Sequence, residues 1–487
     1  MDLVLDGQGP LNAQIVRAMK AAIVSGRLAT GTRVPSTRDL ADSLAVSRTT
    51  IVSAYDQLRT EGYLDGVVGS GSFVRMPHQI AAMKSPRAER FIAPPSRYAG
   101  RAREARSGDA LPFRRIENCR YIFQSGMTLV NPALSTAWSR EVARAALYAI
   151  PDYPSPQGVG ALREAVCNYL ARRRGVLAAP DDILIVGGSQ QALAIVARVL
   201  VDEGAPVVVE EPQYYGTRQA LQAHGASLIG APVDLDGICT DALPADGARL
   251  VCVTPSHQFP SGGILSQARR QALLDYVERH DSWIYEDDYD GEFRYAMRPL
   301  AALRSQDREG RVLYVGTFSK TLFPSLRLAY IVMPPALRQD LINAKFLLDF
   351  GCNTIDQVAL ASFMKAGAFD RHLRVAAKAL RDRREALVQS LEAIDRGRLA
   401  YFDSRAGAHL LVWLKDVAAK EGAAFQRYLH EQGVGMHLID PCYLVPPDGA
   451  GILMTYGALS VKEIRAAMSI FGKCLDARYD MMRSNAV

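Results

Sequence analysis

Short apolar runs rich in β-branched residues alternate with amphipathic segments from about Tyr121 onward, and this alternation constrains the fold more than any other feature. Such runs, bounded by turn residues, are typical of strands buried on both faces of a sheet, and the segments between them have helical periodicity. The pattern predicts an α/β domain with a mainly parallel central sheet. The clearest runs are residues 183–186, 206–209, 250–253, 283–285 and 312–315.

Residues 8–76 have a different organisation. Apolar residues recur at helical spacing from Leu11 to Leu28, and a second helix that ends at Leu44 is expected after Pro35-Ser36-Thr37-Arg38. Ser47 is a favourable N-cap for a third helix over 48–61. Two short strands joined at a glycine turn follow. This order predicts a winged helix-turn-helix domain, which binds DNA with its last helix.

Short hydroxyl side chains and one arginine stand where the third predicted helix begins. Groups of this kind at a helix N-terminus can bond phosphates and base edges, and the helix dipole adds attraction. Taken singly, Ser47 and Thr49 are explained as well by capping, and Arg48 as a solvated side chain. Taken together, the candidate DNA-contacting residues are Arg38, Ser47, Arg48, Thr49, Thr50 and the wing glycine Gly69.

Residues 77–118 are rich in Pro, Ala, Arg and Ser and have weak periodicity, which is typical of a linker. The excess of arginine between Lys84 and Arg120 fits either an anionic partner or a solvated linker. We expect part of the segment to dock on the large domain or on DNA. The predicted organisation is therefore a DNA-binding domain at 8–76, a linker at 77–118 and a large domain at 119–480.

Lys320 lies just after the apolar run at 312–315, between the hydroxyl residues Ser319 and Thr321. A lysine in such a pocket can form a Schiff base with an aldehyde cofactor, because the pocket lowers the pKa of the amine. The hydroxyls and Arg327 can bond a phosphate. The sequence thus indicates a phosphorylated aldehyde cofactor on Lys320.

Three further turns follow predicted strands. Asp287 can keep a pyridine nitrogen protonated, and Tyr289, two residues on, faces the same side of an extended chain. The turn over 187–191 opens a helix and can cradle a phosphate. Tyr214 can stack on a ring. The alternatives are a metal-binding or solvated turn for Asp287 and core packing for Tyr214.

These motifs resemble known families. The N-terminal stretches resemble the GntR family of bacterial regulators, which bind DNA as dimers. The large domain resembles fold-type I aminotransferases, which bind pyridoxal 5′-phosphate (PLP). The combination resembles the MocR/PdxR subfamily of GntR regulators over nearly the whole chain. The motifs that carry the resemblance are residues 34–41, 46–51, 54–58, 61–64, 69–74, 254–262, 286–290, 292–295 and 371–374.

The resemblance implies a role for each cofactor residue. Lys320 is the Schiff-base lysine, Asp287 pairs with the pyridine nitrogen and Tyr289 faces the ring O3′. Tyr214 stacks on the ring, and His257 lies near the cofactor. Tyr153 reaches the phosphate of a partner subunit. The residues that the resemblance places around the phosphate are Ser189, Gln190, Thr317, Ser319 and Arg327.

One departure from the family concerns the arginine that clamps the carboxylate of an amino-acid ligand. It is missing from residues 451–457, and Gly216 stands where the γ-aminobutyrate-sensing type has an arginine. Arg405 is a candidate substitute. The departure disfavours an α-amino-acid effector and efficient transamination, and it favours PLP itself, alone or with an amine, as the signal.

The sequence therefore predicts a PLP-responsive transcription regulator that works as a homodimer. The rival is an active PLP-dependent aminotransferase with a DNA-binding appendage; a protein with a dead PLP site is disfavoured because Lys320, Asp287, Tyr289 and Arg327 are all present. The seven cysteines contain no C-x-x-C pair, which argues against a disulfide framework or a zinc site. Since no signal peptide or long apolar run is evident, we expect a cytoplasmic protein.

Overall fold

The computed structural model describes residues 3–67, 71–75, 94–106, 115–129, 131–147, 152–295 and 300–484 of the 487-residue chain. The chain divides into two compact units, Met1–Pro94 and Pro95–Val487. Each unit has its own apolar core. None of the described helices has the length and apolarity needed to cross a lipid bilayer.

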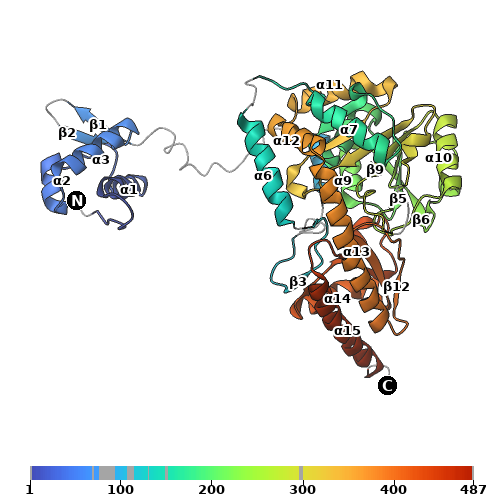
Figure 1. Ribbon diagram of the computed structural model, residues 1–487. Coiled ribbons are helices and arrows are strands. Elements are labelled where there is room, and N and C mark those ends of the chain that lie inside the picture. The colour runs from blue at the N-terminus through green and yellow to red at the C-terminus, as the bar shows by residue number, and fades with distance from the viewer. Residues whose placement is uncertain are drawn as a thin grey trace. The chain divides into compact units, whose positions relative to one another are not determined.

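The N-terminal unit is a three-helix domain with a β-hairpin, as the sequence predicts for a winged helix-turn-helix (Figure 1). Ser47 caps the third helix by accepting a hydrogen bond from the Thr50 amide. The first helix ends at Val24 rather than at Leu28, because Gly26 takes a left-handed conformation at φ 81°. The elements are α1 (Leu11–Val24), α2 (Thr37–Leu44), α3 (Arg48–Thr60), β1 (Leu64–Val67) and β2 (Gly71–Val74).

An eight-stranded sheet forms the centre of the large unit, in the order β4-β11-β10-β9-β8-β5-β6-β7. The neighbours β10, β9, β8, β5 and β6 run parallel, while β11 and β7 pair antiparallel. The predicted mainly parallel sheet is confirmed. Its strands are β4 (Ile183–Val186), β5 (Pro206–Glu211), β6 (Ser227–Asp234), β7 (Gly237–Ile238), β8 (Leu250–Val253), β9 (Trp283–Asp288), β10 (Val312–Thr317) and β11 (Ala329–Val332).

Both faces of this sheet are covered, which explains why its strands read as continuous apolar runs. In β4, Leu184 and Val186 belong to the core formed with α8, whereas Ile183 and Ile185 belong to the core formed with α7. Figure 1 shows helices on either side of the strands. The helices of this unit are α6 (Pro132–Leu147), α7 (Gly160–Arg173), α8 (Ser189–Leu200), α9 (Tyr215–His224), α10 (Gln267–Arg279), α11 (Arg338–Asp349) and α12 (Thr354–Lys365).

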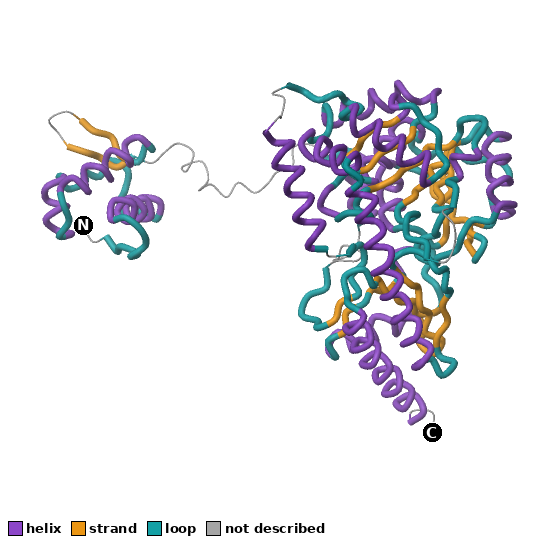
Figure 2. The backbone as a smooth tube through the Cα atoms, in the orientation of Figure 1, coloured by secondary structure: helices purple, strands orange, loops and turns teal. Residues whose placement is uncertain are grey.

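The long helix α13 (Ala368–Ile394) links the large sheet to a second, four-stranded sheet (Figures 1 and 2). This smaller sheet has the order β12-β13-β16-β15 and is antiparallel. Helices α14 (Ala419–Glu431) and α15 (Val461–Ser484) accompany it. Its strands are β12 (Leu399–Tyr401), β13 (His409–Ala418), β15 (His437–Leu438) and β16 (Gly449–Thr455).

A short helix, α5 (Arg97–Ala105), lies within the segment predicted as a linker and packs on α9. Its Arg101 donates hydrogen bonds to the carbonyls of Ala223 and His224 at the C-terminal end of α9, at 3.1 and 3.2 Å. Arg101 also pairs with Glu203 at 2.9 Å. A cation is favourable at the C-terminal end of a helix. The expectation that part of this segment docks on the large domain agrees with these contacts.

Candidate functional site

The carboxyl ends of β9 and β10 bring the two central candidates together. Asp287 is the residue before the end of β9, and Lys320 follows the end of β10 by three residues. Because β9 and β10 are parallel neighbours, with Val315 opposite Asp287, both side chains reach the same edge of the sheet. They line one cavity with about 1190 Å³ of empty space, part of it open to solvent.

Most of the predicted cofactor residues line this cavity, and three do not. Those that line it are Ser189, Tyr214, Asp287, Tyr289, Thr317, Ser319, Lys320 and Arg327. Gln190 is exposed at the start of α8, beside Gly216. His257 lies buried behind Tyr289. Tyr153 is 84% exposed and contacts Phe350, away from the cavity of its own chain.

The N-terminus of α8 forms one end of the cavity. Ser189 is the first residue of the helix, and Gly188 precedes it with φ 108°. Arg327, itself at φ 52°, lies against Gly188 and donates a hydrogen bond to the Gly187 carbonyl at 3.0 Å. Free backbone amides of a helix N-terminus next to a guanidinium make a favourable phosphate site.

We expect Gly188→Ala to weaken the binding of the phosphorylated cofactor about tenfold or more. A Cβ atom at Gly188 would lie 2.4 Å from Arg327 Nη2, so the guanidinium must move, and the residue must also keep a positive φ. Gly204→Ala is the matched control, since Gly204 also has a positive φ but has nothing within 4 Å of a Cβ. Cofactor dissociation constants measured by fluorescence for both variants check this. Equal losses would show that backbone strain, not the contact with Arg327, is responsible.

Two buried polar atoms at the cavity have no hydrogen-bond partner among the described residues: Asp287 Oδ1 and Ser319 Oγ. The neighbouring Asp288 differs, because it pairs with Arg174 at 2.6 Å and accepts a hydrogen bond from the Tyr314 hydroxyl at 2.5 Å. Asp288 is thus held by protein partners through its Oδ2, although its Oδ1 is unpaired as well within the described part of the chain, whereas Asp287 lines the cavity with an unpaired Oδ1. An unpaired buried carboxyl and an unpaired hydroxyl fit a ligand that offers a ring N–H and a phosphate.

Enclosure by the protein changes the ionisation of both central groups. Burial, with repulsion from Asp288, raises the pKa of Asp287 from its ordinary 3.8 to about 7. Burial also lowers the pKa of the Lys320 amine, although Asp290 and Asp287 oppose the change. A neutral amine is the nucleophilic form of lysine. Burial thus shifts the Lys320 amine toward its nucleophilic form, and the Asp287 carboxyl gains from a cationic partner.

We expect Asp287→Asn to reduce the loss of stability that the cofactor-free protein suffers as pH rises. The folded-state pKa of Asp287 lies above its unfolded value, so its contribution to stability is present below about 4 and is lost as pH rises through about 7. Asparagine has no such titration. Calorimetric melting temperatures at pH 5 and pH 8 test this, with the exposed Asp246→Asn as control. Identical pH dependence in wild type and Asp287→Asn would contradict it.

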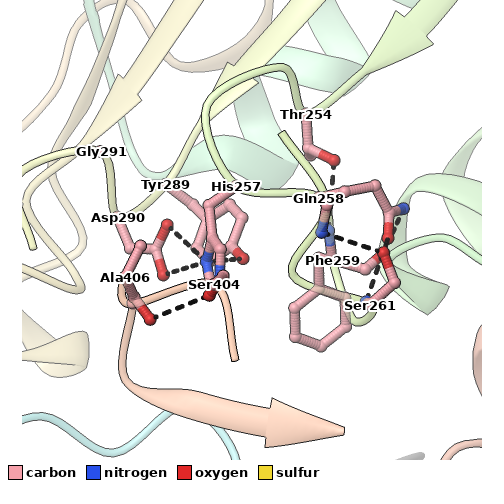
Figure 3. Close-up of polar contacts among 12 residues, drawn as sticks. Thr254, His257, Gln258, Phe259, Ser261, Tyr289, Asp290, Gly291, Ser404 and Ala406 are labelled. Carbon is pink, nitrogen blue, oxygen red and sulfur yellow. Dashed lines mark hydrogen bonds and ion pairs between the residues drawn. The ribbon is translucent and has the colours of Figure 1, made fainter. Parts of the chain in front are cut away.

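A buried histidine orders the tyrosine on the cavity wall (Figure 3). His257 Nδ1 lies 3.0 Å from both the Tyr289 hydroxyl and Asp290 Oδ2, and its Nε2 lies 3.1 Å from Ser404 Oγ. A buried carboxylate needs a donor, which favours the tautomer with hydrogen on Nδ1. The hydroxyl hydrogen of Tyr289 is then available to the cavity. His257 acts on the site through Tyr289 rather than by lining it.

Sequence reasoning missed cavity residues that come from distant segments. Gly126 lies so close to Lys320 that a Cβ there would be 3.4 Å from the lysine Nζ. His409, at the start of β13, lines the same cavity. Neither residue stands in a recognisable motif. A lone histidine in an apolar strand is more often a core residue, and only the fold brings it to the cavity.

Arg405, the candidate substitute for the missing carboxylate clamp, does not line the cofactor cavity. It is exposed and lines a separate cleft with Arg381 and Arg384. Its backbone has φ 51°, and it follows Ser404, whose side chain contacts His257. The turn that carries Arg405 thus directs Ser404, not the arginine, toward the site.

The DNA-contacting candidates gather at the start of α3. The Ser47 hydroxyl lies 2.8 Å from the Thr49 hydroxyl and 2.7 Å from that of Thr50, so capping and hydroxyl clustering occur together. Arg38 near the start of α2 and Arg48 at the start of α3 are exposed. Gly69 lies outside the described residues.

Comparisons with known proteins match both units. Residues 11–74 match the gntR family of bacterial regulatory proteins, and residues 130–467 match aminotransferase class I and II. The chain is 35% identical to the probable rhizopine catabolism regulatory protein MocR of Rhizobium meliloti, over 96% of this chain and 94% of that protein. It is 31% identical to the pyridoxine biosynthesis transcriptional regulator PdxR of Corynebacterium glutamicum, over 78% of each.

Solved structures resemble the large unit. The α-aminoadipate aminotransferase LysN of Thermus thermophilus, complexed with N-(5′-phosphopyridoxyl)-L-leucine, superposes with a TM-score of 0.71 at 26% identity. The similarity covers 79% of this chain and 98% of that chain. A kynurenine aminotransferase of Pyrococcus horikoshii superposes with a TM-score of 0.67 at 24% identity, over 82% of this chain and 98% of that one.

Proposed function

The chain belongs to the MocR/PdxR subfamily of GntR-type transcriptional regulators, and on that premise we propose that PLP held on Lys320 controls how its N-terminal unit binds DNA. The similarity to MocR runs through both units, which favours a regulator over an aminotransferase that carries a DNA-binding appendage. Its place of action is the compartment that holds the operator DNA, the bacterial cytoplasm.

PLP, when bound, supplies an aldehyde carbon open to attack by an amine and a ring that accepts electrons. The chain's own residues position that group. Burial favours the neutral form of the Lys320 amine, and Asp287 would hold a proton on the ring nitrogen. Tyr289, ordered by His257, would donate its hydroxyl hydrogen to O3′, and Tyr214 would cover the ring face. The phosphate group would be held by Ser189, Thr317, Ser319 and Arg327, which line the cavity, whereas Gln190 lies outside it.

The observation that supports this proposal best is the unpaired Asp287 carboxyl in one cavity with Lys320. Burying an unpaired ionisable group is costly, and a chain that needed this cavity only for packing would gain by filling it with apolar side chains. A ligand with a ring N–H removes the cost. The same argument holds for Ser319 Oγ at the phosphate end.

Control of DNA binding requires that PLP favour one arrangement of the protein over another. Binding of two DNA-reading units depends steeply on their spacing, and that spacing follows the arrangement of the large units. Helix α5 offers the mechanical link. It fixes the chain to α9 through Arg101. In addition, α9 begins immediately after Tyr214, the residue that covers the ring.

We expect Arg101→Ala to leave PLP binding unchanged and to reduce the effect of PLP on DNA affinity. The substitution removes the contacts with Ala223, His224 and Glu203 that tie α5 to α9. The measurement is the ratio of operator affinities with and without PLP, for wild type, Arg101→Ala and the control Arg103→Ala, whose guanidinium contacts its own helix. A ratio unchanged in Arg101→Ala would exclude α5 as the link.

The active form is a homodimer in which Tyr153 reaches the phosphate of the partner subunit. The exposure of Tyr153, 84%, supports a role outside its own chain. Sedimentation of the full chain should give twice the 53.2 kDa of one chain. Monomeric protein that carries PLP would contradict the shared site.

The experiment that tests the proposed function as a whole is sequencing of the DNA bound by the full-length protein, with and without PLP. A defined operator whose occupancy changes with PLP supports the proposal. Random DNA, or an operator indifferent to PLP, contradicts it.

A further inference from the structure

One wall of the cavity contains none of the residues that are assigned to the cofactor. It comes from residues 125–129, from α13 and from the smaller sheet, and these residues line the same cavity as Asp287 and Lys320. His409 of β13 and Thr455 of β16 both line this wall and are directly opposite each other in the antiparallel pair.

His409 carries an unused hydrogen-bond acceptor. The residue is 94% buried, at 6% exposure, and its Nε2 has no partner among the described residues. The Pro260 carbonyl favours a proton on this ring, and since Nε2 has no described partner, we infer that Nδ1 faces that carbonyl and carries the hydrogen. Donation from Nδ1 leaves Nε2 as a lone pair in the neutral ring. A buried acceptor without a partner indicates a ligand that donates to it.

The surroundings keep His409 neutral. Its ring centroid lies 5.0 Å from that of His257 and 5.2 Å from that of Phe259. Burial, together with His257 and Lys320, holds the pKa of His409 well below its usual range. A second proton on the ring, which a carboxylate would require for a hydrogen bond at Nε2, is therefore disfavoured.

The charged side chains of the cavity also disfavour a ligand with a carboxylate. Among the described residues that line it, the lysine and arginine side chains are Lys320 and Arg327, and the proposed function assigns both to the cofactor. Asp287 and Asp290 line the same cavity. A ligand carboxylate would thus face the lone pair of His409 Nε2 and the acidic side chains of Asp287 and Asp290. A ligand hydroxyl, in contrast, could donate its hydrogen to His409 Nε2.

We propose that the cavity, beside the cofactor, takes a primary amine that bears a hydroxyl group in place of a carboxylate, and that this hydroxyl donates to His409 Nε2. The inference rests on the proposed function, because it places the ligand next to PLP on Lys320. It names the effector class: hydroxylated amines rather than α-amino acids.

The test compares 2-amino-1,3-propanediol (serinol) with L-serine, which differ only in a hydroxymethyl group against a carboxylate. Each is titrated into the PLP-loaded full-length protein, and the change in visible absorption gives the dissociation constant. We expect serinol to bind at least tenfold more tightly, the order of one hydrogen bond to a buried acceptor. Equal or tighter binding of L-serine, or no response to serinol, overturns the inference.

Variants of His409 separate the hydrogen bond from general packing. His409→Phe should raise the serinol dissociation constant about tenfold and leave that of L-serine within twofold. His409→Arg, which adds a cation at the same place, should reverse the preference toward L-serine. His437→Phe is the control, since His437 is a buried histidine of β15 in the same sheet and does not line the cavity. An unchanged serinol affinity in His409→Phe overturns the inference.

Different results would refute the proposed function and the assignment of His409. Protein that never acquires a visible PLP band refutes the proposed function and the inference with it. Protein that shows the band, loses it in Lys320→Ala and yet prefers L-serine refutes the assignment of His409 alone.

Discussion

Replacing Lys320 with alanine is expected to abolish covalent attachment of PLP. Wild-type protein should be yellow, and borohydride should shift its visible band and fix the cofactor to the chain. Lys320 lines the cavity with Asp287, Tyr289 and Arg327, and its amine pKa is lowered by burial. Without that amine nothing else described in the cavity is a primary amine, so the covalent band should disappear completely.

The measurement for Lys320→Ala is peptide mapping after borohydride reduction, together with visible spectra. The exposed Lys462→Ala is the control and should keep the band. PLP found on another lysine of the reduced wild-type chain would refute the assignment. Residual non-covalent PLP in Lys320→Ala is expected, because the phosphate site at Gly188 and Arg327 remains intact.

Replacing Arg48 with alanine is expected to cause the second large effect, which is a loss of DNA binding. Arg48→Ala should weaken binding and relax base preference by about 1–3 kcal/mol if the guanidinium reads a guanine. Arg38→Ala should weaken binding to all sequences, since we infer that the exposed Arg38 holds a phosphate. The DNA affinity of both variants should fall steeply as the salt concentration rises, because DNA binding releases counterions.

Fluorescence anisotropy at several salt concentrations gives these affinities. Arg27→Ala, an exposed arginine after α1, is the matched control and should change affinity little. Wild-type affinity and specificity in both Arg38→Ala and Arg48→Ala would contradict the placement of the DNA-reading surface at the start of α2 and α3.

Much of the fold follows from the sequence because the signals are local. The five apolar runs are the strands β4, β5, β8, β9 and β10, and Ser47 caps α3. Asp287 and Lys320 could be placed together because parallel neighbouring strands end at one edge of a sheet. In each case a short stretch of chain carries the whole signal.

The remainder depends on contacts between distant residues. Helix α5 has no buried residue and few apolar side chains, and its anchor is a bond from Arg101 to a carbonyl 122 residues away. His409 reaches the cavity because β13 starts there, and Arg405 misses it because its turn directs Ser404 inward. Such placements are properties of the tertiary fold and leave no local pattern.

The central claim is that PLP on Lys320 controls DNA binding, and one titration tests it most directly. Operator DNA is titrated with PLP-loaded protein, PLP-free protein and Lys320→Ala at a single salt concentration, with transaminase assays on the loaded form. We expect the loaded protein to differ at least fivefold in affinity, or in footprint, from the other two, within the usual range of coupling between sites. Equal affinity and footprint in all three, with turnover of several per second on an amino acid, would contradict the claim and identify an enzyme instead.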